Sequence, residues 1–217
     1  MKSSNTNIPN AVIHRLPRYY RYLRDLLDEG VERISSIDLS KRMGVTASQV
    51  RQDLNHFGDF GQQGYGYNVS YLREEIGKIL GLTEDHPVII FGAGHLGTAI
   101  ANHSNFPKRG FRILTLFDND PKVIGTTING MLVRDEGELE QYLKENRVEI
   151  AILALPKAAT QAVADRLISL GVRYFLNFAP LDLHFDEPDV IVESVHISDS
   201  MMTLSYRIAK SRENKKG

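Results

Sequence analysis

The sequence predicts an α/β protein in two parts: a helical N-terminal domain with a helix-turn-helix, then a parallel β-sheet with helices on both faces. Three observations carry this prediction. Residues 11–80 contain short helical patterns and a segment rich in glycine and tyrosine. From residue 88 onward, strand patterns alternate with helical patterns at the spacing of a parallel sheet. A glycine motif of the form G-x-G-x-x-G joins the first of these strands to the helix after it.

The composition limits the kinds of protein that this chain forms. Its 217 residues suffice for one large domain or two small ones. Contents of 42% hydrophobic and 24% charged residues are ordinary for a soluble globular protein. The net charge of −1 hides an uneven distribution, because residues 81–206 carry 17 acidic against 10 basic residues, whereas residues 1–80 carry 9 against 11. This acidic region disfavours nucleic-acid binding by the glycine-motif domain itself.

Several classes of function are excluded by what the sequence lacks. It has no cysteine, which excludes disulfides, thiol redox chemistry, iron–sulfur clusters and cysteine-ligated zinc. A response to cellular redox state therefore requires a bound cofactor. The sequence has no apolar run near the roughly 18 residues that span a membrane, and its first residues show no signal-peptide core. We therefore expect a cytoplasmic protein.

The first helical pattern runs from residue 11 to residue 27, and Pro17 inside it indicates the start of a second helix. Arginines recur at every third position of this pattern, with tyrosines among them: Arg15, Arg18, Arg21 and Arg24. One interpretation is a solvated helix face whose tyrosines cover the core. The other is a face that contacts phosphate or another part of an assembly.

A helix-turn-helix is predicted between residues 36 and 57. Ser36 is a candidate N-cap of its first helix, and Gly44 suits the left-handed residue that ends it. Thr46 and Gln49 have the spacing of a capping box that opens the second helix. The outward side of this helix carries residue types that read base edges, and DNA contacts are predicted for Thr46, Ser48, Gln49, Arg51 and Gln52. The alternative is a three-helix bundle with a polar surface helix.

Residues 58–67 contain four glycines and three aromatic residues. This composition predicts a β-hairpin, a wing that lies against the minor groove or the DNA backbone. The predicted contacts of the wing are Gln63, Gly64, Tyr65, Gly66 and Tyr67. The alternative is a flexible loop between domains. A helix over residues 71–80 and a short linker over residues 83–87 follow.

The glycine motif predicts a dinucleotide-binding turn. Gly92 allows the tight bend, Gly94 lets a pyrophosphate approach the backbone, and Gly97 lets the helix pack closely on the strand. The helix N-terminus offers unpaired N–H groups to the anion. The predicted binding residues of the turn are Gly92, Ala93, Gly94, His95, Leu96 and Gly97. The alternatives are a structural turn without a ligand, or a site for another nucleotide-like anion such as coenzyme A.

Asp118 ends the next predicted strand, 21 positions after Gly97. An acidic residue about 20 positions after such a motif binds the ribose hydroxyls. Asn119 and Asp120 follow, without an arginine to neutralise a 2′-phosphate. The sequence therefore favours NAD(H) over NADP(H), although a solvated strand end is the alternative for Asp118.

Five strands are predicted in this part, over residues 88–91, 112–117, 149–155, 173–178 and 189–195, with helices over residues 95–104, 136–146 and 158–170. Ligands of such sheets lie beyond the carboxyl ends of the strands. We therefore predict that the same crevice is completed by Leu155, Pro156, Asn177, Phe178, Ala179 and Pro180. The alternative reading of the two prolines is simple strand termination.

The last predicted helix runs from Ser198, a candidate N-cap, to about Arg212 and is apolar for a helix with no further core to join. A second subunit would account for this surface.

The order of these parts resembles the Rex family of redox-sensing transcriptional repressors over essentially the whole chain. The residues that carry the resemblance are VRQDL (50–54), GDFGQQGYGY (58–67), GAGHLG (92–97), FDND (117–120), ALP (154–156) and NFAP (177–180). The resemblance implies a winged-helix domain over residues 1–82, a Rossmann domain for NADH and NAD+ over residues 83–196, and a C-terminal helix over residues 197–217 that is exchanged in a homodimer. It also implies a palindromic double-stranded operator that is bound when NADH is low and released when NADH binds.

The chain departs from the family pattern in two features, the sensing residues and the wing. The family often has a tyrosine and an aspartate that sense the nicotinamide together with an arginine; here the matching positions are His103 and His196, with Arg21 as the arginine. Gln63 stands where the wing usually has an arginine. We hypothesise that the two histidines make the NADH response pH-dependent, because imidazoles titrate near neutrality. The alternative is that both are surface or packing histidines.

An enzyme is the main competing interpretation. A dehydrogenase needs a substrate domain and a proton donor or acceptor beside the nicotinamide, yet only residues 197–217 follow the predicted sheet domain. The sequence shows no Ser-His-Asp order and no HExxH motif. We therefore predict cofactor binding without turnover, with no catalytic residue and no metal site. An NAD-dependent oxidoreductase and a coenzyme A-binding interaction module remain the alternatives.

Overall fold

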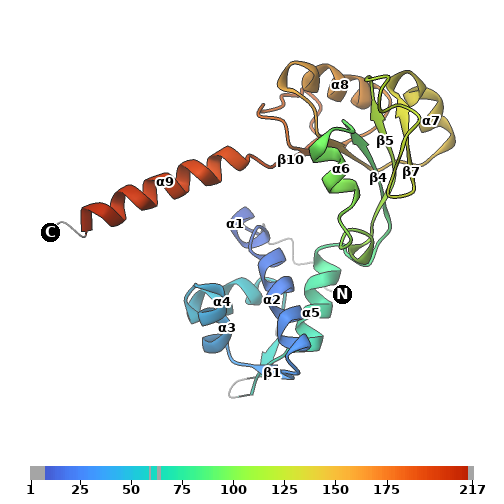
Figure 1. The fold of residues 1–217 in the computed structure, drawn as a ribbon. Coiled ribbons are helices and arrows are strands. Elements are labelled where there is room, and N and C mark those ends of the chain that lie inside the picture. The colour runs from blue at the N-terminus through green and yellow to red at the C-terminus, as the bar shows by residue number, and fades with distance from the viewer. Residues whose placement is uncertain (1–7, 59, 63–64, 215–217) are drawn as a thin grey trace. The chain divides into compact units, whose positions relative to one another are not determined.

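The computed structural model describes residues 8–58, 60–62 and 65–214. The chain divides into two compact units, Met1–Glu84 and Asp85–Gly217, whose elements are coloured along the chain in Figure 1.

The first unit is a helix-turn-helix with a small sheet. Its helices are α1 (Asn10–Ile13), α2 (Leu16–Asp28), α3 (Ser36–Met43), α4 (Ala47–Asn55) and α5 (Val69–Ile79), and its strands are β1 (Arg33–Ile34), β2 (Gly61–Gln62) and β3 (Gly66–Asn68). The strands pair in the antiparallel order β1-β3-β2. The predicted hairpin at β2 and β3 is confirmed, whereas the pairing of β1 with β3 was not predicted.

Local sequence explains where these helices begin and end. Pro17 lies in the first turn of α2, as predicted. Ser35, and not the predicted Ser36, is the N-cap of α3, because its hydroxyl accepts the Asp38 amide hydrogen. Gly44 ends α3 in the left-handed region with φ of 66°. Thr46 caps α4 as predicted, and its hydroxyl oxygen accepts the Gln49 amide hydrogen at 3.1 Å.

One core holds the first unit together. Leucines from α2, α3, α4 and α5 meet at its centre, and the phenol ring of Tyr19 is fully buried among them. The central residues are Leu16, Leu23, Leu26, Leu39, Met43, Val50, Leu54, Leu72 and Ile76. This packing fixes the inward side of α4, so that its outward side is presented to solvent.

The second unit is built on a seven-stranded sheet in the order β10-β9-β8-β4-β5-β7-β6. Its strands are β4 (His86–Phe91), β5 (Phe111–Asp118), β6 (Thr127–Ile128), β7 (Met131–Asp135), β8 (Ile150–Leu153), β9 (Tyr174–Asn177) and β10 (Ile191–Ser194). All neighbours pair in parallel except β6 and β7. The strand order reverses between β4 and β8, which is where ligands bind in doubly wound sheets.

Helices cover both faces of this sheet. They are α6 (His95–Ala101), α7 (Leu139–Glu145) and α8 (Lys157–Ser169), with short 3₁₀ turns at Pro107–Arg109 and Glu136–Glu138. Val88 and Ile90 of β4 pack towards α6, whereas Ile89 and Phe91 pack towards α7 and α8. Successive residues of β4 are therefore buried on opposite faces, as the continuous apolar run predicts for a parallel strand.

The hairpin of β6 and β7 was not predicted from the sequence. Its two-residue turn is Asn129-Gly130, with φ values of 50° and 79°. An Asn-Gly pair between short apolar segments is a strong hairpin signal because both residues tolerate positive φ. That dipeptide was the available sign of this element.

The C-terminal helix α9 (Ile197–Asn214) begins one residue before the predicted start at Ser198. Every residue of α9 is exposed in the single chain. Its large exposed apolar residues are Ile197, Met201, Met202, Leu204, Tyr206 and Ile208. Among the helices that the structure describes, none combines the length and apolarity needed to cross a membrane.

Candidate functional site

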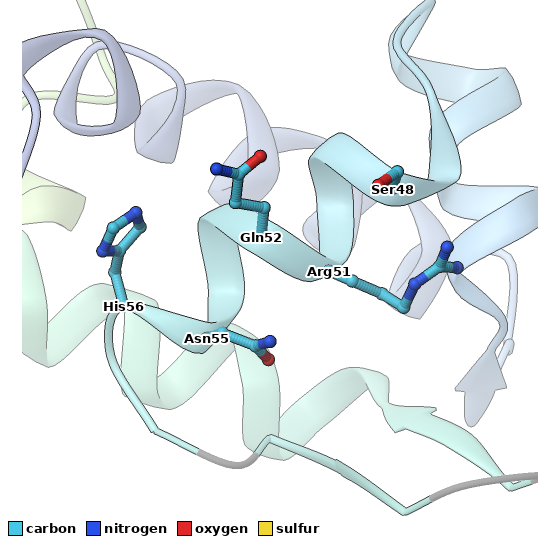
Figure 2. A pocket seen from close by; sticks show the side chains of 5 residues that line it. All are labelled: Ser48, Arg51, Gln52, Asn55 and His56. Atoms are coloured by element: carbon cyan, nitrogen blue, oxygen red, sulfur yellow. The ribbon is translucent and has the colours of Figure 1, made fainter.

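The outward side of α4 forms an open hollow of about 530 Å³. It is lined by Ser48, Arg51, Gln52, Asn55 and His56, whose side chains are shown in Figure 2. Three of these, Ser48, Arg51 and Gln52, were predicted as DNA contacts. The structure brings them together because they follow one another at helical spacing on the side opposite Val50 and Leu54.

The inward side of α4 holds a buried carboxylate, Asp53, that the sequence analysis missed. Arg15 donates to both its oxygens, from Nε to Oδ2 at 2.7 Å and from Nη2 to Oδ1 at 2.7 Å. The Tyr19 hydroxyl donates to Oδ2 at 3.0 Å, and Gln49 Nε2 donates to Oδ1 at 2.8 Å. Asp53 lies three residues after Val50, and this spacing was the signal for its inward position.

This network changes the interpretation of two predicted residues. The Gln49 N–H donates to Thr46 as the predicted capping box requires, but its side-chain Nε2 donates to Asp53, so this side chain does not point freely outward. Arg15, read as one of a row of surface arginines, has a side chain only 24% exposed and is paired with the fully buried Asp53. Burial alone would raise the pKa of Asp53, but hydrogen bonds from Arg15, Gln49 and Tyr19 outweigh it and lower that pKa.

Arg51 is held at one end of the hollow, where its Nη1 donates to the Ser36 hydroxyl at 2.9 Å. Tyr65 is 70% exposed on the wing. The structure corrects the prediction for Tyr67, which belongs to the core and not to the DNA-contacting surface; burial raises the pKa of its hydroxyl. Strand alternation is the reason, because Tyr67 points inward in β3 next to the exposed Asn68.

Gly66 also has a structural role. A Cβ there would lie 2.5 Å from the Ile34 carbonyl oxygen, and its φ is +68°, so glycine is required for strand pairing. The predicted wing residues Gln63 and Gly64 lie outside the described residues.

The glycine motif in the second unit has the geometry that its three glycines predict. Gly92 has φ of +97°, and a Cβ there would overlap the Ala154 carbonyl oxygen. A Cβ on Gly97 would overlap the Gly92 carbonyl oxygen, so α6 packs directly on the turn. By contrast, a Cβ on Gly94 would meet nothing within 4 Å. The open space at Gly94 lies where a pyrophosphate approaches the backbone of such turns.

The start of α6 leaves donors for an anion. Gly94 is its N-cap, and no side chain caps it. The Gly92 amide donates to the Phe117 carbonyl and the Ala93 amide to Asp118, so these two are engaged within the turn. His95 and Leu96 follow at the exposed start of the helix, where N–H groups lack intrahelical acceptors.

Asp118 stands at the carboxyl end of β5, as predicted. Its Oδ2 accepts the Ala93 amide at 2.6 Å and its Oδ1 accepts the Asp120 amide at 2.9 Å. Asp135 of β7 is its register partner. Glu136 follows, and burial together with the charge of Asp118 raises the pKa of Glu136. This acidic edge disfavours a 2′-phosphate and so adds to the preference for NAD(H).

Two further loops follow the neighbouring strands, at the carboxyl ends of β8 and β9. Leu155 and Pro156 connect β8 to α8, and Pro156 is the N-cap of α8. Phe178, Ala179 and Pro180 follow β9.

The side chain of Asn177 forms hydrogen bonds with the backbone of this second loop. It is fully buried, its Oδ1 accepts the Ala179 amide at 2.9 Å, and its Nδ2 donates to the Leu181 carbonyl at 2.8 Å. Its amide is thus engaged in holding the loop, which differs from the predicted contact with a ligand.

The predicted switch residues lie in different units. Arg21 is exposed on α2, with its guanidinium 5.6 Å from the Tyr22 ring centre. His103 is exposed after α6, and its ring lies 4.6 Å from that of Phe106. His196 follows β10, with Nε2 3.9 Å from Asp182 Oδ1.

Known proteins contain both kinds of site in one chain. A family model described as "Putative DNA-binding protein N-terminus" matches residues 7–55, and one described as "CoA binding domain" matches residues 83–181. The redox-sensing transcriptional repressor Rex of Clostridioides difficile (strain 630) is 51% identical, over 96% of this chain and 99% of the relative. The chain belongs to the Rex family. The Rex protein of Thermoanaerobacter pseudethanolicus is 50% identical, over 99% of this chain and 95% of the relative.

Solved structures of the Rex family agree with the fold. RSP, a Rex-family repressor, has been solved in complex with β-NADH; it matches 98% of this chain and 99% of its own length with a TM-score of 0.89 and 47% identity. RSP in complex with β-NAD+ and operator DNA matches 98% of this chain and 97% of its own length, with a TM-score of 0.89 and 50% identity. The predicted order of a DNA-binding domain and a Rossmann-like domain is therefore confirmed.

Proposed function

We propose that this chain represses transcription by binding a palindromic operator as a homodimer, and that it leaves the operator when NADH binds. The observation that carries the proposal is the match of nearly the whole chain, at a TM-score of 0.89, to a repressor solved with NADH and with NAD+ and operator DNA. Both site types stand on one chain, α4 in the first unit and the glycine turn in the second.

In the proposed operator complex, α4 enters the major groove. Ser48, Arg51 and Gln52 are on its exposed side, and their side chains supply donors and acceptors for base edges and phosphates. Thr46 stands at the start of the same helix. The wing, with the exposed Tyr65, contacts the DNA beside the groove.

The glycine turn supports NAD(H) as the cofactor. The space beside Gly94 accepts a pyrophosphate, and a side chain there would fill it. Asp118 presents carboxylate oxygens for the ribose hydroxyls. We propose that the loops at Leu155–Pro156 and Phe178–Pro180 close the nicotinamide end of the site. Bound nucleotide supplies the redox signal, since NADH and NAD+ differ only in the charge and shape of the nicotinamide ring.

The response follows from preferential binding. A ligand releases DNA only to the extent that it prefers one arrangement of the protein over another. The adenosine end holds both redox forms alike, so the chain must distinguish them at the nicotinamide end. We propose that Arg21, His103 and His196 transmit this difference between the two units.

The exposed apolar face of α9 supports a homodimer. A helix with six large apolar residues in solvent is unfavourable for an isolated chain, and we propose that residues 197–217 are exchanged between subunits. We further propose that the repressor binds its nucleotide without turnover and acts in the cytoplasm.

Operator binding with and without NADH tests this proposal. A palindromic operator duplex would be selected from random DNA by the purified full-length protein, and its affinity measured by fluorescence anisotropy. The proposal predicts tight binding that NADH weakens and coenzyme A does not. Binding unaffected by NADH, or steady oxidation of NADH by a metabolite, would contradict it.

A further inference from the structure

We propose that His56 is a further operator contact and makes operator affinity depend on pH. This inference rests on the proposed binding of the operator by α4. His56 was not among the residues predicted to contact DNA. It directly follows α4 and lines the same hollow as Arg51 and Gln52.

The position of His56 extends the contact surface beyond the last turn of α4. Gln52 and His56 are four residues apart, so their side chains are neighbours along one side of the helix, as Figure 2 shows. The hydrogen bonds, ion pairs and ring contacts of the described residues include none for the His56 side chain. The imidazole is therefore available to a ligand in the hollow.

His56 matters for DNA binding because the side chains that line the hollow carry little positive charge. Arg51 is the one permanent cation among the five described residues that line the hollow, since Ser48, Gln52 and Asn55 are neutral. The carboxylate of α4, Asp53, points inward and is paired with Arg15. Protonation of His56 thus doubles the positive charge of these five side chains.

Most of the charged groups on the elements that pack against α4 are also engaged. Arg15, the N-cap of α2, is bound to Asp53, and Arg18 of α2 donates to the Met43 carbonyl. On α3, Lys41 is paired with Asp38, and Arg42 is paired with Glu29. Asp59, which follows along the chain, lies outside the described residues. No carboxylate in the described part of these elements contacts the imidazole.

Two general properties suit an imidazole at this place to bind a phosphate. An imidazole changes charge between about pH 5 and 8. The carbonyl groups at a helix C-terminus attract a cation, and His56 is the C-cap of α4. A protonated ring donates to a phosphate from either nitrogen, whereas a neutral ring adds no charge.

The expected effect of His56 protonation can be measured from the salt dependence of operator affinity. Each phosphate that a protein neutralises adds about 0.9 to the slope of log affinity against log salt. Two subunits with protonated His56 therefore steepen the slope by roughly 1.8. An exposed ion pair strengthens binding by up to about fivefold, so a dimer gains up to roughly 25-fold.

The experiment measures operator affinity of the full-length protein without NADH, at pH 6 and pH 8, between about 50 and 200 mM salt. The wild-type protein is expected to bind more tightly and with a steeper salt slope at pH 6. Equal slopes and affinities at the two pH values would overturn the inference. Absence of operator binding at both would instead contradict the proposed function.

Three variants assign the effect to this residue. His56→Gln keeps a polar side chain and is expected to show the shallow slope at both pH values. His56→Arg carries a fixed charge and is expected to show the steep slope at both, which tests the inference even if the glutamine variant folds poorly. His14→Gln replaces the other histidine of the first unit and is expected to behave as wild type. A His56→Gln protein that retains the pH dependence would refute the assignment.

Discussion

Replacement of the buried carboxylate by an amide, Asp53→Asn, is expected to weaken the packing of α4 on the rest of the first unit. The carboxylate accepts bonds from Arg15 at 2.7 Å on each oxygen, from Tyr19 at 3.0 Å and from Gln49 at 2.8 Å. An asparagine offers one oxygen and turns an NH₂ group towards donors. The removal of one partner from a buried ion pair costs about 3–5 kcal/mol. Because the Arg15 side chain is 24% exposed and keeps part of its hydration, we expect about 2–4 kcal/mol.

Hydrogen exchange of the full-length protein measures this loss within one unit. A loss of about 3 kcal/mol corresponds to roughly 150-fold faster exchange of core amides that exchange through opening of the unit. Amides of α4 should show this change, whereas those of β4 in the second unit serve as an internal reference. Unchanged protection of α4 would refute the claim that the Asp53 network holds this helix. A double variant, Arg15→Met with Asp53→Leu, should recover much of the protection because neither charge is then buried alone.

The Asp53 carboxylate also makes the stability of the first unit depend on pH, and the direction of this dependence follows from its lowered pKa. The pKa of Asp53 is lower in the folded protein than its ordinary value. Its contribution to stability is therefore present above about pH 4 and is lost as the pH falls through the lowered pKa. The difference in α4 protection between wild type and Asp53→Asn should shrink over that acidic range. A difference that persists at low pH would show that charge is not the cause.

Further variants test the other sites. Gly94→Val should abolish NADH-induced release and leave the fold and operator binding intact, since a Cβ there meets nothing within 4 Å; retained NADH sensitivity in a gel-shift assay would contradict this. Gly97→Ala should destabilise the second unit by about 1–3 kcal/mol in urea unfolding, because its Cβ overlaps the Gly92 carbonyl, and unchanged stability would argue against that packing. Arg51→Ala should cost about 1–3 kcal/mol of operator affinity with relaxed sequence preference if Arg51 reads a base; uniform loss across DNA sequences would make it a phosphate contact. If His103 and His196 carry the switch, NADH potency should differ between pH 6 and pH 8, and equal potency would exclude the idea.

Much of the fold was predictable because local rules and burial agree. The apolar run at Val88–Phe91 predicted a strand buried on both faces, and both faces are covered. Thr46 and Gly44 marked the ends of two helices through capping and positive φ. The hairpin at Asn129-Gly130 was missed because its strands are too short for a clear periodicity.

The sites were less predictable because side-chain partners come from distant parts of the chain. Outward residue types on α4 were found from helical spacing, but the bond from Gln49 to Asp53 was not foreseen, because Asp53 is held inward by Arg15, 38 residues away. Tyr67 was assigned to the wing surface by composition, although strand alternation turns it into the core. The positions of the three motif glycines followed from the sequence because backbone geometry alone requires them.

The most direct test of the central claim is operator occupancy measured while the NADH to NAD+ ratio is varied at constant total nucleotide. The full-length protein and its selected operator duplex are kept at fixed concentrations. We predict that the occupied fraction falls as the ratio rises and recovers when NAD+ is restored. An occupancy that stays the same across all ratios would contradict the account.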